Sequence, residues 1–260
     1  MTRSGPAQPL LGRAVLVTRP AHQAEKLARL VREAGGEAVL FPALAIESPA
    51  DPAPVREILA RLANFDLAVF VSPNAVEHGL ALLEGAWPAG VPAAAMGEGT
   101  AAALRRYGVR SVIVPPGADS ESLLETPQLK SLRGKCVLIL RGEGGREVLA
   151  EELRQRGAEV AYAECYRRLR PRNDPAALIA RWEQGGLHAV TVMSGETLDN
   201  LWDMLGSRGQ QLLRDTPLFA PHANIAQRAA GLGLTEVAVT PPGDEGLVRG
   251  LSAWFSLHTR

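Results

Sequence analysis

The spacing of apolar residues predicts short buried strands that alternate with amphipathic helices. Residues 137–140 (VLIL) form a continuous apolar run, which is typical of a strand covered on both faces of a parallel sheet. After a glycine-rich turn, Leu149 and Leu153 lie four positions apart on one face of a predicted helix, and Gly157 is suited to ending it. A second strand is predicted from residue 159. The segment therefore reads strand, turn, helix, strand.

A second copy of this unit lies at the start of the chain. GRAVLVTR (12–19) matches GKCVLILR (134–141) position for position. A later stretch, 93–123, pairs in the same way with 218–247, and both contain Pro-Pro-Gly near their ends. The chain is therefore predicted to be an internal duplication in the order A, B, A′, B′.

The alternation of strands and helices predicts an α/β protein with parallel sheets. A length of 260 residues suits two domains. Two pairings of the repeats are open: A with B and A′ with B′ in tandem, or an interlaced pair joined by two strands. A strand is predicted over residues 38–46. Residues 38–48 and 159–171 are both longer than a typical strand of about 5 or 6 residues, which favours interlacing.

The amino-acid composition indicates which kinds of binding partner and cellular location to expect. Lys plus Arg and Asp plus Glu are both 28, so no global field attracts nucleic acid or a membrane surface, and anion recognition must be local. Cys136 and Cys165 form no disulfide framework or metal-ligand spacing. Residues 1–20 lack a signal-peptide core, and no apolar run approaches the ~18 residues of a membrane span. A cytoplasmic protein is expected.

The turns that follow the predicted strands are the candidate ligand-binding segments. RGEGGR (141–146) brings free backbone N–H groups, Arg141 and Arg146 to the carboxyl end of a strand, where open α/β sheets bind ligands. It lacks the spacing of a dinucleotide or phosphate loop, and a purely structural turn is the alternative. MGEGTAAAL (96–104) is a similar turn, and the serine turns at 72–74 and 194–196 are equivalent to each other.

Two further side chains are candidates. His222, in the turn after a predicted strand, is suited to anion binding or proton transfer, although a solvated turn histidine is the simpler interpretation. Tyr166 lies on the long second strand and is followed by Arg167 and Arg168, where it is either functional or an interfacial tyrosine. No metal site, nucleophile elbow or paired carboxylate motif is found, which argues against a hydrolase.

These motifs together resemble the uroporphyrinogen-III synthase family. The resemblance covers essentially the whole chain, and its most specific part is RGEGGREVLAEELRQRGAEV with Tyr166 and Pro171, joined by FVSPNAV, MGEGTAAAL and VLVTRP. It implies two parallel-sheet α/β domains joined by a two-stranded ladder. It also implies cyclisation of hydroxymethylbilane, in a cleft between the domains, with loss of water and inversion of the last ring. No cofactor or metal is implied.

The resemblance also supports the interlaced pairing and sets domain boundaries. They are 1–40 plus 172–260 for a discontinuous domain, 48–165 for an inserted domain, and 41–47 and 166–171 for connecting strands. The expected partner is the small-molecule substrate, with a transient contact to the preceding enzyme of the pathway. The expected state is a monomer that binds no nucleic acid or membrane.

Site residues follow from the same resemblance. Tyr166 is implied as the donor that assists departure of the substrate hydroxyl. The chain departs from the family at PHANIA (221–226), which replaces a glycine-threonine turn. The residues implied to bind substrate are Thr18, Arg19, Ser72, Asn74, Gly97, Thr100, Arg141, Gly142, Arg146, Ser194, Gly195, His222 and Asn224.

The implied reaction agrees with these turns. The substrate carries eight carboxylates, which backbone N–H groups and a few arginines can hold without a basic protein. Since the substrate also closes by itself to the uninverted isomer, the enzyme must select a conformer and exclude water. The main rival is a non-catalytic two-lobed binding or sensor module. A sugar or nucleotide transferase is disfavoured because no phosphate loop or acidic metal motif is present.

Overall fold

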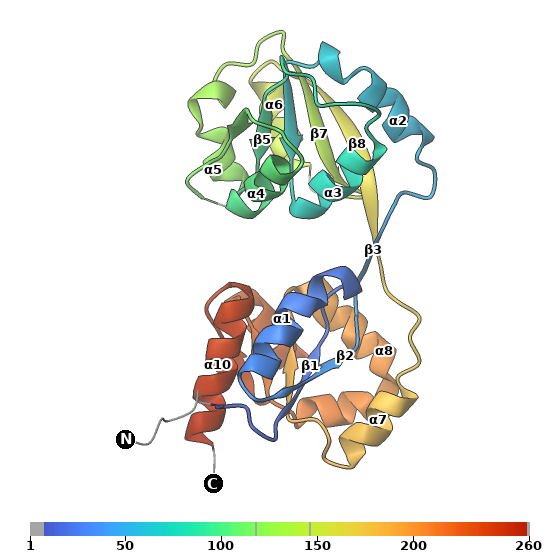
Figure 1. Cartoon of the computed structure of the whole chain (residues 1–260), viewed down its shortest axis with the longest axis vertical. Coiled ribbons are helices and arrows are strands. Elements are labelled where there is room, and N and C mark those ends of the chain that lie inside the picture. Colours follow the sequence, from blue (N-terminus) through green and yellow to red (C-terminus); the bar gives the residue numbers. More distant parts are fainter. Residues whose placement is uncertain (1–7, 118, 146, 259–260) are drawn as a thin grey trace. The chain divides into compact units, whose positions relative to one another are not determined.

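The chain divides into two compact units. A computed structural model describes residues 8–117, 119–145 and 147–258. The discontinuous unit consists of the segments before Ile46 and after Arg168, and the inserted unit is Ile46–Arg168 (Figure 1). The strand pairs that form the body of both sheets are parallel, so the α/β class expected from the alternation is confirmed.

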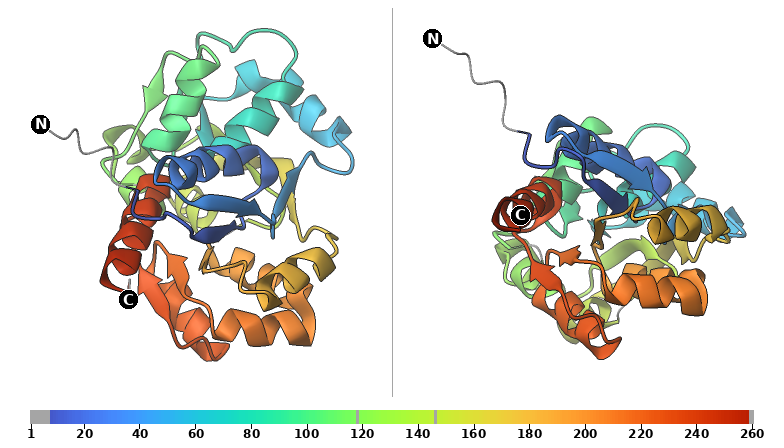
Figure 2. Two further views of the ribbon diagram at one scale, coloured as in Figure 1. Left: turned by 60° about the horizontal axis from the view of Figure 1, so that its bottom comes forward. Right: turned by 90° about the horizontal axis from the view of Figure 1, so that it is seen from below.

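The discontinuous unit alternates short strands with helices. Its described elements are β1 (Ala14–Val17), α1 (Ala21–Glu33), β2 (Glu37–Leu40), α7 (Ala176–Glu183), β9 (Ala189–Thr191), α8 (Gly195–Arg214), β10 (Leu218–Ala220), α9 (Ala223–Gly231), β11 (Val237–Val239) and α10 (Gly243–Leu257). The strand order in its sheet is β11-β10-β9-β1-β2. Helix α1 buries Ala24, Leu27 and Val31 at helical spacing, and it packs against β2 and α10 (Figure 1, Figure 2).

The inserted unit is built in the same way. Its described elements are β3 (Ala45–Glu47), α2 (Ala53–Ala60), η1 (Leu62–Asn64), β4 (Leu67–Phe70), α3 (Pro73–Leu82), β5 (Ala93–Ala95), α4 (Glu98–Arg106), β6 (Val112–Ile113), α5 (Ser120–Leu124), η2 (Pro127–Leu129), β7 (Cys136–Gly142), α6 (Val148–Gln155) and β8 (Glu159–Leu169). The strand order in its sheet is β3-β8-β7-β4-β5-β6. The central strands β4 and β7 are buried along most of their length, as their apolar runs predict.

The internal duplication is visible in the strand register. Ala14 on β1 pairs with Glu37 on β2, and the equivalent Cys136 on β7 pairs with Glu159 on β8. Gly35 and Gly157 follow the two equivalent helices with φ of 88° and 89°. Glycine adopts this left-handed backbone without a steric cost, so both copies end the helix in the same way.

The predicted single strand 38–46 is wrong. The structure has β2 ending at Leu40 and β3 beginning at Ala45, with Pro42 between them. Phe41 N and Ala43 N still donate to the carbonyls of Val17 and Thr18, but the regular pairing ends at Val17 with Leu40, so β2 ends where its partner β1 ends. The second extended segment, by contrast, contains one strand, because β8 runs without a break from Glu159 to Leu169. Among the described residues, no helix combines the length and the apolar character needed to cross a membrane.

Candidate active site at the carboxyl edges of the sheets

Many of the candidate residues lie at or near the carboxyl ends of parallel strands. In the inserted unit, Ser72 follows β4, Gly97 follows β5, and Gly142 ends β7. In the discontinuous unit, Thr18 follows β1 and Ser194 follows β9. The carboxyl ends of parallel strands meet at one edge of a sheet, where open α/β proteins bind ligands. Each unit therefore brings its own candidates to one edge.

The inserted unit has a hollow at this edge, which we name the carboxyl-edge pocket. Its volume is about 540 Å³, and it brings together Ser72, Arg141, Gly142 and Tyr166. Apolar side chains form part of its lining, among them Met96 and the 56 % exposed Val148. The pocket thus combines an apolar surface with hydroxyl and guanidinium groups, a composition typical of small-molecule sites.

Tyr166 is held in this pocket from two sides. It is only 4 % exposed, and its hydroxyl lies 3.2 Å from Ser72 Oγ, with either oxygen able to donate. A Cβ added at Gly142 would lie 2.7 Å from two atoms of the Tyr166 ring. Glycine is therefore required at position 142 for the ring to pack against β7. The His78 ring lies near the tyrosine as well, with the two ring centroids 5.9 Å apart.

Ser72 also caps a helix. Its Oγ accepts a hydrogen bond from Ala75 N at 3.1 Å, which satisfies one of the free donors at the start of α3. Ser194 caps α8 in the same manner, with Oγ accepting from Thr197 N at 3.1 Å. The predicted equivalence of the two serine turns is confirmed in their geometry. Asn74 and Gly195 lie in the first turns of these helices.

Arg141 is surrounded by internal acceptors. Its guanidinium donates to Glu147 Oε1 at 2.7 Å and to Glu164 Oε1 at 3.0 Å. It also donates to the Gly145 carbonyl at 3.1 Å and lies 3.8 Å from the centroid of the Tyr162 ring. Hydrogen bonds from Tyr162 and then from Arg141 lower the pKa of Glu147. These contacts tie the glycine-rich turn to β8, so Arg141 has a structural role besides its predicted contact with substrate.

The glycine-threonine turn lies beside the next strand. Gly97 is the N-cap residue of α4, and Thr100 lies inside this helix with a buried side chain. Arg146, the remaining candidate of the inserted unit, falls outside the described residues.

In the discontinuous unit, two of the candidate residues make internal contacts and two are exposed. Thr18 Oγ1 is buried and donates to the Thr191 carbonyl at 2.6 Å, which links β1 to β9. Arg19 forms an ion pair with Asp244 of α10. His222 is the N-cap residue of α9 without a capping bond from its side chain, and both His222 and Asn224 are exposed.

Sequence reasoning missed other residues of the carboxyl-edge pocket. Arg168 and the turn Asp119–Glu121 also line it. Asp119 caps α5 by accepting from Ser122 N at 2.7 Å, and hydrogen bonding to Ser122 lowers its pKa. The Asp-Ser-Glu-Ser sequence carries the signal of such a cap. The signal for Arg168 is its spacing of two from Tyr166, because alternate residues of a strand share a face.

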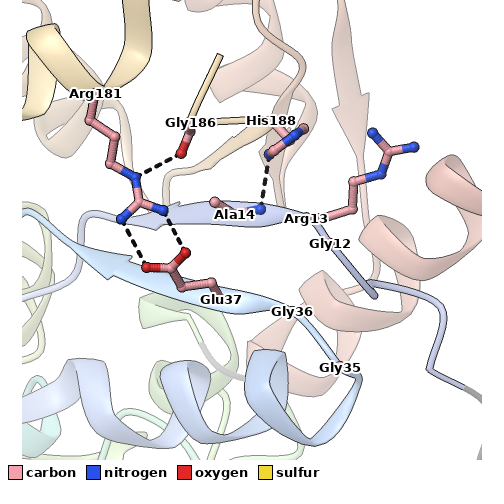
Figure 3. A pocket seen from close by; sticks show the side chains of 9 residues that line it. All are labelled: Gly12, Arg13, Ala14, Gly35, Gly36, Glu37, Arg181, Gly186 and His188. Carbon is pink, nitrogen blue, oxygen red and sulfur yellow. Dashed lines mark hydrogen bonds and ion pairs between the residues drawn. The ribbon is translucent and has the colours of Figure 1, made fainter. Parts of the chain in front are cut away.

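A second hollow lies at the amino end of the strands of the discontinuous unit (Figure 3). Its volume is about 260 Å³. Arg181 forms two hydrogen bonds with Glu37, at 2.8 and 2.5 Å, and Ala14 N donates to His188 Nδ1 at 3.0 Å. Burial, followed by the charges of Arg13 and Arg181, lowers the pKa of His188. This hollow lies at the opposite strand ends from the candidate residues, so we assign it no part in the site.

Comparisons with known proteins agree on one family. The family model described as uroporphyrinogen-III synthase HemD matches residues 25–249. The chain is 35 % identical to uroporphyrinogen-III synthase of Salmonella typhimurium and 34 % identical to that of Escherichia coli, in each case over 91 % of this chain and 99 % of the relative.

Solved structures agree on the fold. The structure of a mutant uroporphyrinogen III synthase from Thermus thermophilus matches with a TM-score of 0.61 at 20 % identity, over 95 % of this chain and 99 % of that one. The enzyme from Helicobacter pylori 26695 gives 0.58 at 18 % identity, over 95 % and 99 %. By its sequence, over nearly its full length, the chain belongs to the uroporphyrinogen-III synthase family.

Proposed function

We propose that this chain cyclises hydroxymethylbilane to uroporphyrinogen III, with loss of water and inversion of the last ring. The observation that carries this proposal is the match to synthases over 91 % of this chain and 99 % of each bacterial relative. A non-catalytic sensor module is not favoured by any comparison. The enzyme is thus a lyase that acts on a small-molecule substrate.

Tyr166 is the proposed donor to the departing hydroxyl of the substrate. Its side chain lines the carboxyl-edge pocket, and its hydroxyl is oriented by Ser72, which itself is fixed at the start of α3. A hydrogen bond to the leaving oxygen lowers the barrier as the carbon–oxygen bond breaks. The azafulvene that remains is electrophilic, and the last pyrrole attacks it, so conformer selection decides which isomer forms.

Helix N-termini are the proposed binding sites for substrate carboxylates. Backbone N–H groups and the helix dipole favour an anion at such positions. The starts of α3, α4, α8 and α9 all lie at the carboxyl edges of their sheets. These starts contain the candidates Ser72, Asn74, Gly97, Thr100, Ser194, Gly195, His222 and Asn224.

Further proposals concern the state of the protein. We propose that the two compact units are its domains and that it acts as a cytoplasmic monomer without added metal or nucleotide. A transient contact with the preceding enzyme is proposed because the substrate cyclises spontaneously once released.

The test is incubation of the purified protein with freshly made hydroxymethylbilane, followed by isomer analysis of the oxidised product. We expect isomer III to form faster than the uninverted isomer forms without protein. If the protein changes neither the rate nor the isomer ratio, the catalytic proposal is wrong and the binding-module alternative gains support.

A further inference from the structure

Arg168 lies close to the proposed proton donor along strand β8. It lies two residues after Tyr166 on β8, and both residues line the carboxyl-edge pocket. Two residues span about 7 Å along a strand, and alternate side chains lie on one face. Unlike the buried Tyr166, Arg168 is exposed. The long arginine side chain can therefore reach groups of a ligand that lie close to the tyrosine hydroxyl.

The two neighbouring arginines differ from Arg168 in exposure or in position. Arg141 lines the same pocket but is only 7 % exposed. Arg167, the residue between Tyr166 and Arg168, does not line this pocket. Of these three arginines, Arg168 is the one that is both exposed and in the pocket.

The rest of the lining restricts where an acidic ligand can place its charge. Asp119 and Glu121 contribute carboxylates to the pocket, and a ligand carboxylate beside them is repelled. Met96 and Val148 supply apolar surface on which a flat ring can lie. A ring with acidic side chains is therefore favoured in the orientation that brings one of them to Arg168.

This inference rests on the proposed function, because it concerns the substrate of that reaction. Eight carboxylates on four pyrroles give each ring two acidic side chains. The ring that bears the departing hydroxyl therefore has carboxylates only a few bonds from the oxygen at Tyr166. We infer that Arg168 binds an acidic side chain of this ring, and that it determines specificity for a carboxylated pyrrole at the Tyr166 position.

The test compares two arginine variants with two substrates. Arg168→Gln removes the charge, and Arg168→Lys keeps it without the planar fork that matches a carboxylate. Arg167→Gln is the control with the same change of charge at the adjacent residue. The second substrate is a bilane in which the acidic side chains of the hydroxymethyl ring are replaced by alkyl groups of the same length.

With hydroxymethylbilane, Arg168→Gln is expected to lower kcat/KM by at least about tenfold, mainly through KM, as expected for a lost charged hydrogen bond. Arg168→Lys is expected to lie between this variant and wild type, and Arg167→Gln close to wild type. With the alkylated bilane, Arg168→Gln and wild type should have equal kcat/KM. This equality separates substrate recognition from a general structural role.

Two results overturn the inference. In the first, Arg168→Gln has the same kcat/KM as wild type with hydroxymethylbilane. In the second, Arg168→Gln lowers kcat/KM by the same factor with both substrates. The unfolding midpoint of each variant is measured beside its kinetics, and Arg168→Lys gives the answer if Arg168→Gln does not fold. If wild type itself forms no isomer III, the proposed function fails. If wild type is active and Arg168→Gln is unchanged, only the role of Arg168 fails.

Discussion

The substitution Gly142→Ala tests how closely the position of Tyr166 is controlled. The added Cβ would lie 2.7 Å from two atoms of the tyrosine ring. Ordinary carbon contacts are about 3.5 to 4.0 Å, so the ring must move by roughly 1 Å. The Tyr166 hydroxyl is already 3.2 Å from Ser72 Oγ, and such a movement breaks or misaligns that bond.

Two consequences are expected. The strained packing should lower the free energy of unfolding by about 1 to 3 kcal/mol, the usual cost of extra atoms in a close-packed site. Displacement of the donor should lower kcat by about 100-fold, since a catalytic group misplaced by about 1 Å typically costs that much. Chemical denaturation and initial rates of isomer III formation measure the two effects separately.

Two controls test whether contact with the Tyr166 ring causes these effects. Gly90→Ala adds the same methyl group where no atom lies within 4 Å of the new Cβ, so its stability and rate should stay near wild type. In a Tyr166→Ala background the ring is gone, and Gly142→Ala should then cost little stability. A Gly142→Ala protein with wild-type kcat, or one equally destabilised in both backgrounds, would show that the ring contact does not constrain the site.

Two other predictions concern Arg141 and His188. Arg141→Ala should lower the free energy of unfolding by about 1 to 3 kcal/mol, because it removes bonds to Glu147, Glu164 and Gly145; a higher KM at unchanged stability would instead support the predicted carboxylate contact. His188 should make the free energy of unfolding depend on pH. Its pKa is lowered in the folded state, so the unfolded chain binds a proton more readily. The contribution of His188 to stability is therefore full above about pH 6.5 and is lost as the pH falls towards the folded-state pKa. Urea denaturation between about pH 5 and 8 should show this loss in wild type but not in His188→Asn, and parallel curves would contradict it.

The repeated pattern made much of the fold predictable. Matching apolar runs at 12–19 and 134–141 predicted two copies of one unit, and the matching registers of β1 with β2 and β7 with β8 confirm them. The break between β2 and β3 was missed because the residues around Pro42 are apolar enough to extend a strand pattern. β2 ends where its partner β1 ends, at the pair Val17 and Leu40, and hydrophobic periodicity does not record where a neighbouring strand ends.

The site was less predictable, because its contacts depend on neighbouring strands. The partners of Arg141 include Glu164, which faces it only through the pairing of β7 with β8. The turn at Asp119 joins the pocket although it is remote in sequence from Tyr166. Tyr166 was a candidate from its position on the long strand, and its role as a donor came from the resemblance, but its burial and its bond to Ser72 require the folded sheet.

The most direct test of the account is the isomer composition of the product that Tyr166→Phe forms from hydroxymethylbilane. This substitution keeps the ring against Gly142 and removes only the donor. We predict that turnover falls by about 10² to 10⁴, the usual contribution of a positioned proton donor, while the unfolding midpoint changes little. Spontaneous closure then competes, so the product should shift towards the uninverted isomer. Wild-type turnover with pure isomer III would contradict the role of Tyr166.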